Sequence, residues 1–456
     1  NGQAEMGAYE FVFFFFFQTV YVDSSKSVSG DGSTWNTAFK TLAEAITRQS
    51  CSNIKEIRVA KGTYFPTGVQ ANFNRDSTFL ITRGDLKILG GFPSGGGVRN
   101  PLNFPTFLSG DIGGTNNIAD NSYHVMTISN VISTEDSIII DGFTFINGNA
   151  NGSGTKNFNG ADIARNDGGG LMIWNVQNGF KTQFRYCRFL ANRAEDAGGA
   201  IYTQSSSPLF VNLLVSGNLA NYGGGFALVS ASNAKLINCT IAGNRCGSSG
   251  AGGAMRNSSS NPTIINSIIY DNNSGISNNS STPVISYSLV QNLTSIADGN
   301  LNGNTNNPNF VQTIPYAQAP TLLGDYRLQA GSPCINKGNN SQVPSFSISD
   351  LDGNERIYLG SVEMGAYEYV NCPNIEFVFV DSSVSFSGNG ATWANAYKTL
   401  SEALDFIHCS NIKEIRIAKG TYYPTGTQNG TNKDSTFLIT RGGVKILGGY
   451  PSGGGT

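Results

Sequence analysis

Four asparagines recur at a nearly constant spacing in the middle of the chain. Asn192, Asn218 and Asn244 are 26 residues apart, and Asn272 follows after a further 28. A pair or triplet of glycines comes ahead of each asparagine, and short runs typical of β-strands, such as 200–202 (Ala-Ile-Tyr), lie between them. A short period built from strands, glycine and asparagine restricts the chain to a repetitive fold.

This pattern predicts an all-β solenoid, a right-handed parallel β-helix, in which each period forms one rung with a rise of about 4.8 Å. Asparagines at one corner of successive rungs would adopt the left-handed conformation and bond to the neighbouring backbone, forming a ladder. A β-sandwich would instead show turn signals about every 8–12 residues, without asparagines in phase. Upstream, residues 41–46 predict a short helix that caps the open end of the solenoid.

A second repeat is much longer. The motif Glu-Met-Gly-Ala-Tyr-Glu at 5–10 recurs at 363–368, an offset of 363 − 5 = 358 residues, and the offset holds to the C-terminal residue. About 61 of the 94 positions in 5–98 are identical to their counterparts. The sequence therefore predicts tandem units of about 358 residues, and we interpret the chain as a window on a longer array.

The two repeats together predict the domain organisation. The expected segments are the end of a preceding unit (1–18), a parallel β-helix (19–323) with a cap region (19–110) and regular rungs (about 137–295), a connecting segment (324–370), and the start of the next unit (371–456). In such an array, the connecting segment would join one β-helix to the next.

Composition excludes several classes of function. The chain has 29 Lys+Arg and 31 Asp+Glu, a net charge of −2, and no basic cluster, which argues against a nucleic-acid partner. No apolar run reaches the roughly 18 residues of a membrane span, so we expect no transmembrane segment. The only histidines are His124 and His408, which makes a nucleophilic centre built on histidine a poor hypothesis.

Several motifs resemble those of known surface proteins. Val-Tyr-Val-Asp at 20–23, Gly-Ser-Thr-Trp at 32–35 and Lys-Gly-Thr-Tyr at 61–64 are similar to the N-terminal part of pectate-lyase-like β-helix proteins. Phe-Leu-Ala-Asn at 189–192 and Gly-Gly-Ala-Ile at 198–201 resemble the paired motifs of chlamydial polymorphic outer-membrane adhesins. The resemblance implies the fold and an extracellular address more strongly than an activity, because β-helices host lyases, hydrolases and adhesins.

The connecting segment carries the most specific resemblance. Tyr-Arg-Leu at 326–328, Gly-Ser-Pro-Cys-Ile at 331–335, Asp-Leu-Asp-Gly-Asn at 350–354 and the motif at 363–368 are similar to the choice-of-anchor Q segment. That segment is typical of large secreted proteins of Bacteroidota, often exported by the type IX system. The resemblance implies a location outside the cell or at the cell surface.

One group of charged residues is the best candidate for a site. The candidates are Asp162, Asp167, Glu195, Asp196, Arg165, Arg193 and Lys181. Asp167 and Asp196 precede the glycines of successive rungs, so we expect them to stack about one rung apart, where two carboxylates would perturb each other's pKa or share Ca²⁺. The alternative is that these are turn residues facing water, and we assign no catalytic residue. The loop 148–165 interrupts the rung pattern, and such insertions often carry function.

Asp350 and Asp352 form a second candidate for calcium. With Asn354 they are similar to part of a calcium loop, but the glutamate expected at the twelfth position is absent, so a plain turn is the alternative. We expect no cofactor, with Ca²⁺ as the one alternative.

The cysteines indicate an oxidising compartment. Cys372 with Cys409, and Cys239 with Cys246, are the candidate disulfides. The run 11–17 breaks the long repeat, since Phe14 stands where the second copy has Cys372. Either the identities in this run depart from the true ones, or the two copies have diverged.

Three functions fit this sequence. The leading hypothesis is an extracellular structural or adhesive filament of tandem β-helix units, joined head to tail and open to lateral bundling with like chains, because a fibre gains length from each added copy. Such arrays resemble surface filaments for attachment or prey contact, among them the grappling-hook filaments of predatory marine bacteria. The alternatives are a polysaccharide lyase or hydrolase, and a non-catalytic module that binds cell-surface glycans.

Overall fold

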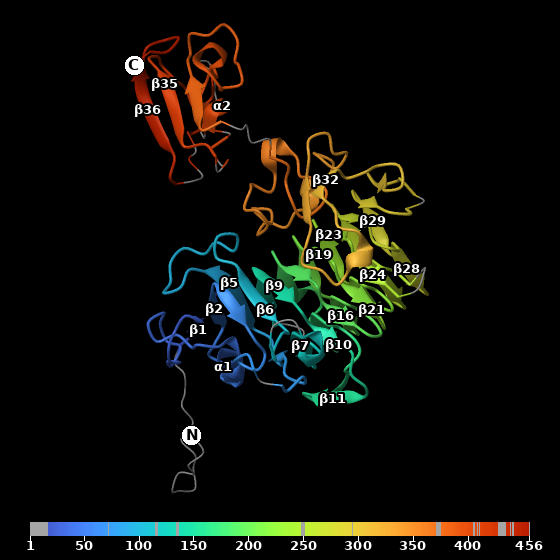
Figure 1. The fold of residues 1–456 in the computed structure, drawn as a ribbon. Coiled ribbons are helices and arrows are strands. Elements are labelled where there is room, and N and C mark those ends of the chain that lie inside the picture. Colours follow the sequence, from blue (N-terminus) through green and yellow to red (C-terminus); the bar gives the residue numbers. More distant parts are fainter. Residues whose placement is uncertain are drawn as a thin grey trace. The chain divides into compact units, whose positions relative to one another are not determined.

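The computed structural model describes residues 17–456 except for 72, 115–116, 134–135, 248–250, 294, 371–374, 405, 408, 410, 427–434, 438, 440–441 and 456. The chain divides into two compact units, the first ending at Tyr369 and the second beginning at Val370 (Figure 1). Most of the regular structure in both units is β-strand, as the composition predicts.

Three large parallel sheets form the first unit. Sheet A contains β1 (Thr19–Val22), β2 (Glu56–Ala60), β5 (Leu86–Phe92), β8 (Ile138–Asp141), β14 (Thr182–Arg185), β18 (Leu209–Val211), β22 (Lys235–Ile237), β26 (Thr263–Ile265) and β29 (Val284–Ser286). Sheet B contains β3 (Gly62–Tyr64), β6 (Thr106–Ser109), β9 (Phe143–Ile146), β15 (Arg188–Leu190), β19 (Leu214–Ser216), β23 (Thr240–Ala242), β27 (Ile268–Tyr270), β30 (Leu289–Val290) and β31 (Leu301–Asn302). Sheet C contains β4 (Phe79–Ile81), β7 (Met126–Ser129), β13 (Leu171–Trp174), β17 (Ile201–Gln204), β21 (Phe226–Val229), β25 (Met255–Ser258) and β28 (Ile276–Asn279).

Smaller elements complete the unit. Sheet D contains β10 (Asn149–Ala150), β16 (Arg193–Ala194), β20 (Leu219–Ala220) and β24 (Arg245–Cys246). Two antiparallel hairpins are β11 (Thr155–Phe158) with β12 (Ala161–Ala164), and β32 (Phe310–Gln312) with β33 (Asp325–Leu328). The helices are α1 (Leu42–Thr47) and the 3₁₀ turns η1 (Arg48–Ser50), η2 (Ile118–Asp120), η3 (Gly179–Lys181), η4 (Tyr316–Gln318), η5 (Asn340–Gln342) and η6 (Tyr358–Gly360).

The order of these strands makes the unit a solenoid. The regular coils run through sheets C, A, B and D in turn, as in β13, β14, β15 and β16, and the next coil begins at β17 beside β13. Among the residues that the structure describes, sheet D contains only β10, β16, β20 and β24, so the coils at both ends of the solenoid have no strand in it. The pairings within the four sheets are parallel, and they keep register from coil to coil except at an irregularity between β2 and β5. The predicted all-β fold, a parallel β-helix, is confirmed.

Phenylalanines from successive coils stack inside the solenoid. The rings of Phe145 and Phe189 lie parallel with centroids 4.4 Å apart, and Phe184, Phe210 and Phe226 follow at 5.6 Å and 5.4 Å. All five side chains are buried. Since each buried ring removes a large apolar area from water, the axial stack is a main source of stability.

A ladder of buried asparagines lies at the corner after sheet B. Asn218 Oδ1 accepts from the backbone N–H of Asn192 at 2.9 Å, and Asn244 Oδ1 accepts from that of Asn218 at 3.0 Å. Asn272 continues the series, with Oδ1 2.9 Å from the nitrogen of Asn244. Each side-chain amide also donates to a carbonyl of the preceding rung, so the asparagines satisfy backbone groups that face no water.

The ladder differs from the prediction in one respect. The left-handed residue at each rung is not the asparagine but the residue before it: Ala191 (φ 55°), Gly217 (φ 62°), Gly243 (φ 67°) and Asp271 (φ 55°). That residue turns the chain, and the asparagine then points inward with an ordinary backbone. The sequence prediction had the asparagine both turn the chain and bond to the neighbouring rung.

Helix α1 covers the first rung. Thr41 and Glu44 form a reciprocal capping box that begins the helix, with Thr41 Oγ1 3.2 Å from the nitrogen of Glu44. Leu42, Ala45 and Ile46 are buried against the core of the solenoid. The predicted helical cap is therefore present. None of the helices in the described part of the chain has the length and apolar character of a membrane span.

The segment after the last rung returns along the solenoid and covers the outer side of sheet B. Its apolar contacts join Leu214, Ala242, Ile268 and Leu289 to Phe310, Tyr326, Leu328, Cys334, Leu351, Met364, Ala366 and Tyr367. Three corner asparagines hold its backbone and side chains. Asn212 donates to Ser347 Oγ at 2.8 Å, Asn238 donates to the Glu363 carbonyl at 3.0 Å, and Asn266 Oδ1 accepts from the nitrogen of Asn339 at 2.8 Å.

The repeated motif at 363–368 buries charge in this segment. Arg356 and Glu368 form an ion pair in which both side chains are almost inaccessible to water. Burial, followed by the neighbouring Glu368, raises the pKa of Glu363 to about 10, so Glu363 keeps its proton at neutral pH. The motif is thus part of a packed core between segment and solenoid.

The second unit repeats the beginning of the first. Its elements are β34 (Phe377–Val380), η7 (Trp393–Asn395), α2 (Leu400–Leu404), β35 (Glu414–Ala418) and β36 (Lys445–Tyr450). Asp381 Oδ2 accepts from the nitrogen of Gly453 at 2.7 Å, as Asp23 Oδ2 accepts from that of Gly95 at 2.8 Å in the first unit. The tandem repeat in sequence is therefore a repeat in local structure.

Candidate functional site

Three successive turns that lead into sheet C carry the candidate site. Phe73 to Asp76 precede β4, Tyr123 precedes β7, and Arg165 precedes β13. Because β4, β7 and β13 are neighbouring strands in register, side chains just before them are brought together from distant parts of the sequence.

An ion pair spans the first and third of these turns. Arg165 Nε lies 2.7 Å from Asp76 Oδ1, and Arg165 Nη2 lies 2.9 Å from Oδ2. Arg165 Nη1 also donates to the Ser153 carbonyl at 3.4 Å. The hydrogen bonds from Arg165 hold the pKa of Asp76 below its usual value, so this carboxylate stays ionised.

Arg75 lies over the ring of Tyr123. Its guanidinium carbon is 4.1 Å from the ring centroid, within the range of a cation–π contact. Nε donates to the Asn121 carbonyl at 2.6 Å, and Nη2 donates to the Asn149 carbonyl at 2.9 Å. Burial lowers the pKa of Arg75 from its ordinary high value, and this network holds the cation in one orientation.

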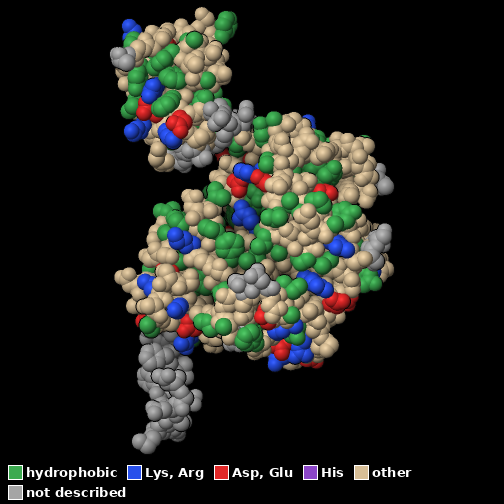
Figure 2. Space-filling view, viewed as in Figure 1, with side chains coloured by type: hydrophobic (Ala, Val, Ile, Leu, Met, Phe, Trp, Pro, Cys, Tyr) green, Lys and Arg blue, Asp and Glu red, His purple; other side chains and the backbone are tan. Residues whose placement is uncertain are grey.

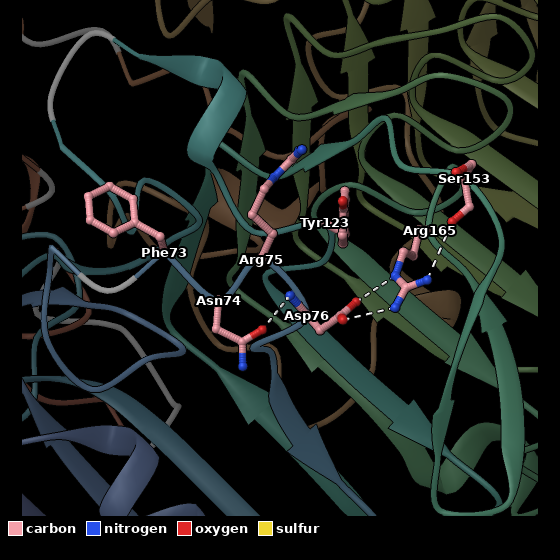
Figure 3. Close-up of a pocket in the computed structure, with 7 residues that line it drawn as sticks. All are labelled: Phe73, Asn74, Arg75, Asp76, Tyr123, Ser153 and Arg165. Atoms are coloured by element: carbon pink, nitrogen blue, oxygen red, sulfur yellow. Dashed lines mark hydrogen bonds and ion pairs between the residues drawn. The ribbon is translucent and has the colours of Figure 1, made fainter.

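These residues line a pocket of about 430 Å³ (Figure 3). The close-up shows Asp76 facing Arg165, with Phe73 at the opposite margin. Phe73 is 67% exposed, although a phenylalanine usually gains by burial. The pocket thus combines an open aromatic ring, two guanidinium groups and one carboxylate.

His124, beside Tyr123, is buried and does not open into the pocket. Its Nδ1 lies 3.0 Å from the Gly168 carbonyl oxygen. Burial lowers the pKa of His124 to about 4, so the imidazole is neutral at physiological pH. His408 lies outside the described residues.

Only part of the predicted charged group is brought together. Arg165 lines the pocket, and exposed Asp162 accepts from Asn157 Nδ2 at 2.8 Å in the hairpin β11–β12. Arg193 pairs with exposed Glu195 at 3.3 Å. Lys181 lies in η3, at the turn from sheet C to sheet A, and not at the turn that leads into sheet C.

Asp167 and Asp196 occupy successive rungs but are offset by one residue. Asp167 Oδ1 accepts from the nitrogen of Ala197 at 2.9 Å, whereas the nitrogen of Asp196 bonds to the Asn166 carbonyl. Burial, and secondarily the charge of Asp196, raises the pKa of Asp167 to about 7. The charge of Asp196 therefore acts on Asp167 as expected, but the two residues do not stack directly.

Asp350 and Asp352, the second calcium candidate, lie in a hydrogen-bonded turn. The buried Asp350 carboxylate accepts from the nitrogens of Asp352, Asn354 and Glu368 at 2.9, 2.8 and 2.7 Å. Asn354 Nδ2 also donates to it at 3.0 Å. Asp352 lies 3.8 Å from Arg188 Nη2. Within the described ranges, no group of three His, Cys, Asp or Glu side chains is arranged to hold a metal ion.

The cysteines differ from the predicted pairing at one of two places. Cys239 and Cys246 are both thiols, because Cys239 points into the core beside the Phe210 carbonyl while Cys246 lies in sheet D. Cys409 is disulfide-bonded. Its predicted partner, Cys372, lies outside the described residues.

Sequence reasoning missed most of the pocket. The interruption at 148–165 marked the hairpin that supplies Ser153 and Arg165, but Phe73, Arg75 and Asp76 lie in the region interpreted as cap. Nothing in their spacing signals that they meet Arg165, because the contact depends on which strands become neighbours.

Figure 2 shows the charged side chains on one face of the molecule. On this face the described Lys and Arg side chains lie among Asp and Glu and form no continuous basic stripe.

A family model supports the fold. Residues 169–317 match the family model described as right handed beta helix region. A crystal structure of pectate lyase Pel9A is similar at 12% sequence identity and a TM-score of 0.32, covering 77% of this chain and 96% of that one. No curated protein matches the sequence. At this level of similarity no activity is transferred, and what the family match and the strand register establish together is the fold, a right-handed parallel β-helix.

Proposed function

We propose that this chain is a non-catalytic, glycan-binding segment of an extracellular β-helix filament. The observation that carries this proposal is the pocket at the turns before sheet C. Phe73 is open to solvent there, beside Arg75, Asp76 and Arg165. An exposed ring next to fixed hydrogen-bonding groups suits a sugar, which has apolar C–H faces and polar hydroxyl edges.

The charge of the pocket favours an acidic polysaccharide. Two guanidinium groups and one carboxylate line it, leaving one positive charge. The attraction to a carboxylate would be one of charge, because Nε and Nη2 of both Arg75 and Arg165 already donate within the protein. Polymers of uronic acids are therefore the ligand class we propose.

The same geometry argues against hydrolysis in this pocket. Hydrolysis requires one carboxyl group that donates a proton and a second that acts as base or nucleophile. Asp76 is the only carboxylate in the lining, and Arg165 occupies both of its oxygens. The residues suit holding a sugar more than cleaving it.

The long repeat supports the filament part of the proposal. Successive copies in one chain extend a fibre. The position of Phe73 is Thr431 in the second copy, so the aromatic part of the proposed pocket belongs to the first unit. Secretion, a cell-surface address, head-to-tail copies and lateral bundling belong to this proposal, and they rest on the sequence resemblances described above.

The test is binding of the full chain to polygalacturonate and alginate, measured by calorimetry together with an assay for released saccharide. We expect binding without product, and a loss of affinity of about 10-fold or more for Phe73→Ala and for Arg75→Ala. Phe386→Ala and Arg193→Ala are matched controls, since Phe386 is 88% exposed in the second unit and Arg193 lies outside the pocket. Unchanged affinity in both pocket variants would overturn the proposal.

A polysaccharide hydrolase is the second candidate, favoured by Asp167. With its pKa raised to about 7, this carboxyl group is partly protonated at neutral pH, as a general acid must be, and exposed Asp196 lies on the next rung. Saccharide release that disappears in Asp167→Asn, but persists in Phe73→Ala, would select this function over binding alone.

A further inference from the structure

Five buried oxygen atoms without a hydrogen-bond donor occur in one part of the first unit. They are Asp111 Oδ1, Asp120 Oδ1, Asn121 Oδ1, Ser122 Oγ and Asn149 Oδ1. An oxygen buried without a partner destabilises the folded state, so native proteins rarely leave several together. Their grouping indicates a ligand that supplies positive charge or donors.

A loop between β6 and β7 brings these atoms together. The chain leaves the solenoid after Gly110 and returns at Ser122, whose nitrogen donates to the Gly110 carbonyl at 2.8 Å. The nitrogen of Asn149, one rung later, donates to the Ser122 carbonyl at 2.9 Å. Asp111 and Ser122 thus begin and end the loop, and Asn149 lies against its base.

The side chains of Asn149 and Asp120 both bond to residues at η2. Asn149 Nδ2 donates to the Ile118 carbonyl at 2.6 Å, which brings Oδ1 of the same amide to this turn. Asp120 closes the turn, and its Oδ2 accepts from Asn117 Nδ2 at 2.8 Å. A Cβ atom on Gly113 would lie 2.4 Å from the Asp120 carboxyl carbon, so Asp120 packs beside the start of the loop, two residues from Asp111.

The Asp111 and Asp120 carboxylates are near enough for their charges to interact. The backbone of Gly114 bonds to the Asp111 carboxylate, and the charge of Arg75 acts on Asp120. The donors of Arg75 are directed to the carbonyls of Asn121 and Asn149 and to Asn151 Oδ1, so the five buried side-chain oxygens have no donor.

We propose that this loop binds one calcium ion, with Asp111, Asp120 and Asn149 as side-chain ligands and Asn121 and Ser122 beside them. Calcium takes about six to eight oxygen ligands from carboxylates, amides, hydroxyls and water, and tolerates irregular geometry. A buried water is the other occupant to consider, but one water donates two hydrogen bonds and neutralises neither carboxylate. The set contains no nitrogen or sulfur ligand that would favour zinc.

The test uses the full chain after treatment with a chelator. Adding 1 mM Ca²⁺, about 100-fold above a dissociation constant near 10 µM, is expected to raise the melting temperature of the first unit by about 3–5 °C. Calorimetry is expected to show at least a 10-fold loss of affinity in the double variant Asp111→Asn, Asp120→Asn. The matched control is Asp162→Asn, Asp196→Asn, which removes two exposed carboxylates outside the loop.

Native mass spectrometry of the wild-type chain keeps the proposal falsifiable if the double variant does not fold. We expect one Ca²⁺ bound at this site, retained in the control variant and lost in Asp111→Asn alone. No bound ion in the wild-type chain, or an equal loss of affinity in the control, would overturn the proposal. Glycan binding is measured separately, so either proposal can fail without the other.

Discussion

Two stretches of the same corner use polar side chains in opposite ways. In the ladder, Asn192 and Asn218 lie two residues after the ends of β15 and β19, and each amide is bonded to the rungs on both sides. Two rungs before Asn192, Asp111 stands at the same distance from the end of β6, yet its Oδ1 has no donor. Where rungs stack regularly, the hydrogen-bonding groups of the side chain are bonded to the neighbouring rungs. Where the stack is interrupted, such groups stay available for a ligand.

The interruption has a steric cause at Gly148, which occupies the ladder position between these two residues. A Cβ atom there would lie 1.9 Å from the carbonyl oxygen of Gly169. An asparagine cannot be placed at this rung, so the ladder begins only at Asn192. The loop and hairpin around the pocket and the proposed calcium site lie on the side where the ladder is absent.

The strongest way to break this corner is Gly148→Ala. The added methyl group collides with backbone that cannot move without distorting two rungs, so we expect a loss of about 4 kcal/mol or more in the free energy of unfolding. Gly114→Ala is the matched control, because a Cβ atom there meets no atom within 4 Å. Chemical denaturation of both variants measures the difference, and equal stabilities would contradict the steric explanation.

Removing one step of the ladder is expected to cost somewhat less. Asn218→Ala leaves the nitrogen of Asn192 and the Phe189 carbonyl buried without partners. We expect a loss of about 3 kcal/mol in urea unfolding. Asn221→Ala, exposed on the same coil, should change the free energy by less than about 0.5 kcal/mol. A small effect at Asn218 would mean that water replaces the amide.

The smallest expected effect is a change in how stability depends on pH. The pKa of Asp167 is raised in the folded chain to about 7, so the unfolded chain loses its proton first and stability falls as pH rises from about 4 to 7. Asp167→Asn removes this titration. The variant should gain about 1–3 kcal/mol over the wild type between pH 4 and 8, with the difference constant above pH 8. Thermal unfolding across this range checks it, and a constant difference throughout would show that Asp167 is not buried as described.

The periodic part of the fold was accessible from the sequence because each rung repeats the same local requirement. Asn192, Asn218 and Asn244 recur where a buried corner needs an amide, and the capping box at Thr41 and Glu44 is a local signal for a helix. The left-handed residue was predicted one position too late, and at the first rung it is Ala191, a residue type that rarely adopts this conformation.

The candidate sites could not be predicted from the sequence in the same way. The segment at Asp350 that is similar to part of a calcium loop forms a turn, because the nitrogens of Asp352, Asn354 and Glu368 donate to the Asp350 carboxylate. The predicted disulfide between Cys239 and Cys246 does not form, because the Cys239 side chain points into the core. Local spacing records which residues are near in sequence, but not which atoms a neighbouring rung has already bonded.

The sequence by itself therefore determined the solenoid, its cap, and the repetition of its first elements in the second unit. Those features depend on side chains that recur at fixed intervals and meet their own equivalents one rung away. Only the tertiary structure decided which polar residues remain available. Asp76 meets Arg165, and Asp111 lies near Asp120, because the insertions that interrupt the rungs fold back over neighbouring turns. Such contacts join residues with no common period, so no pattern in the sequence could announce them.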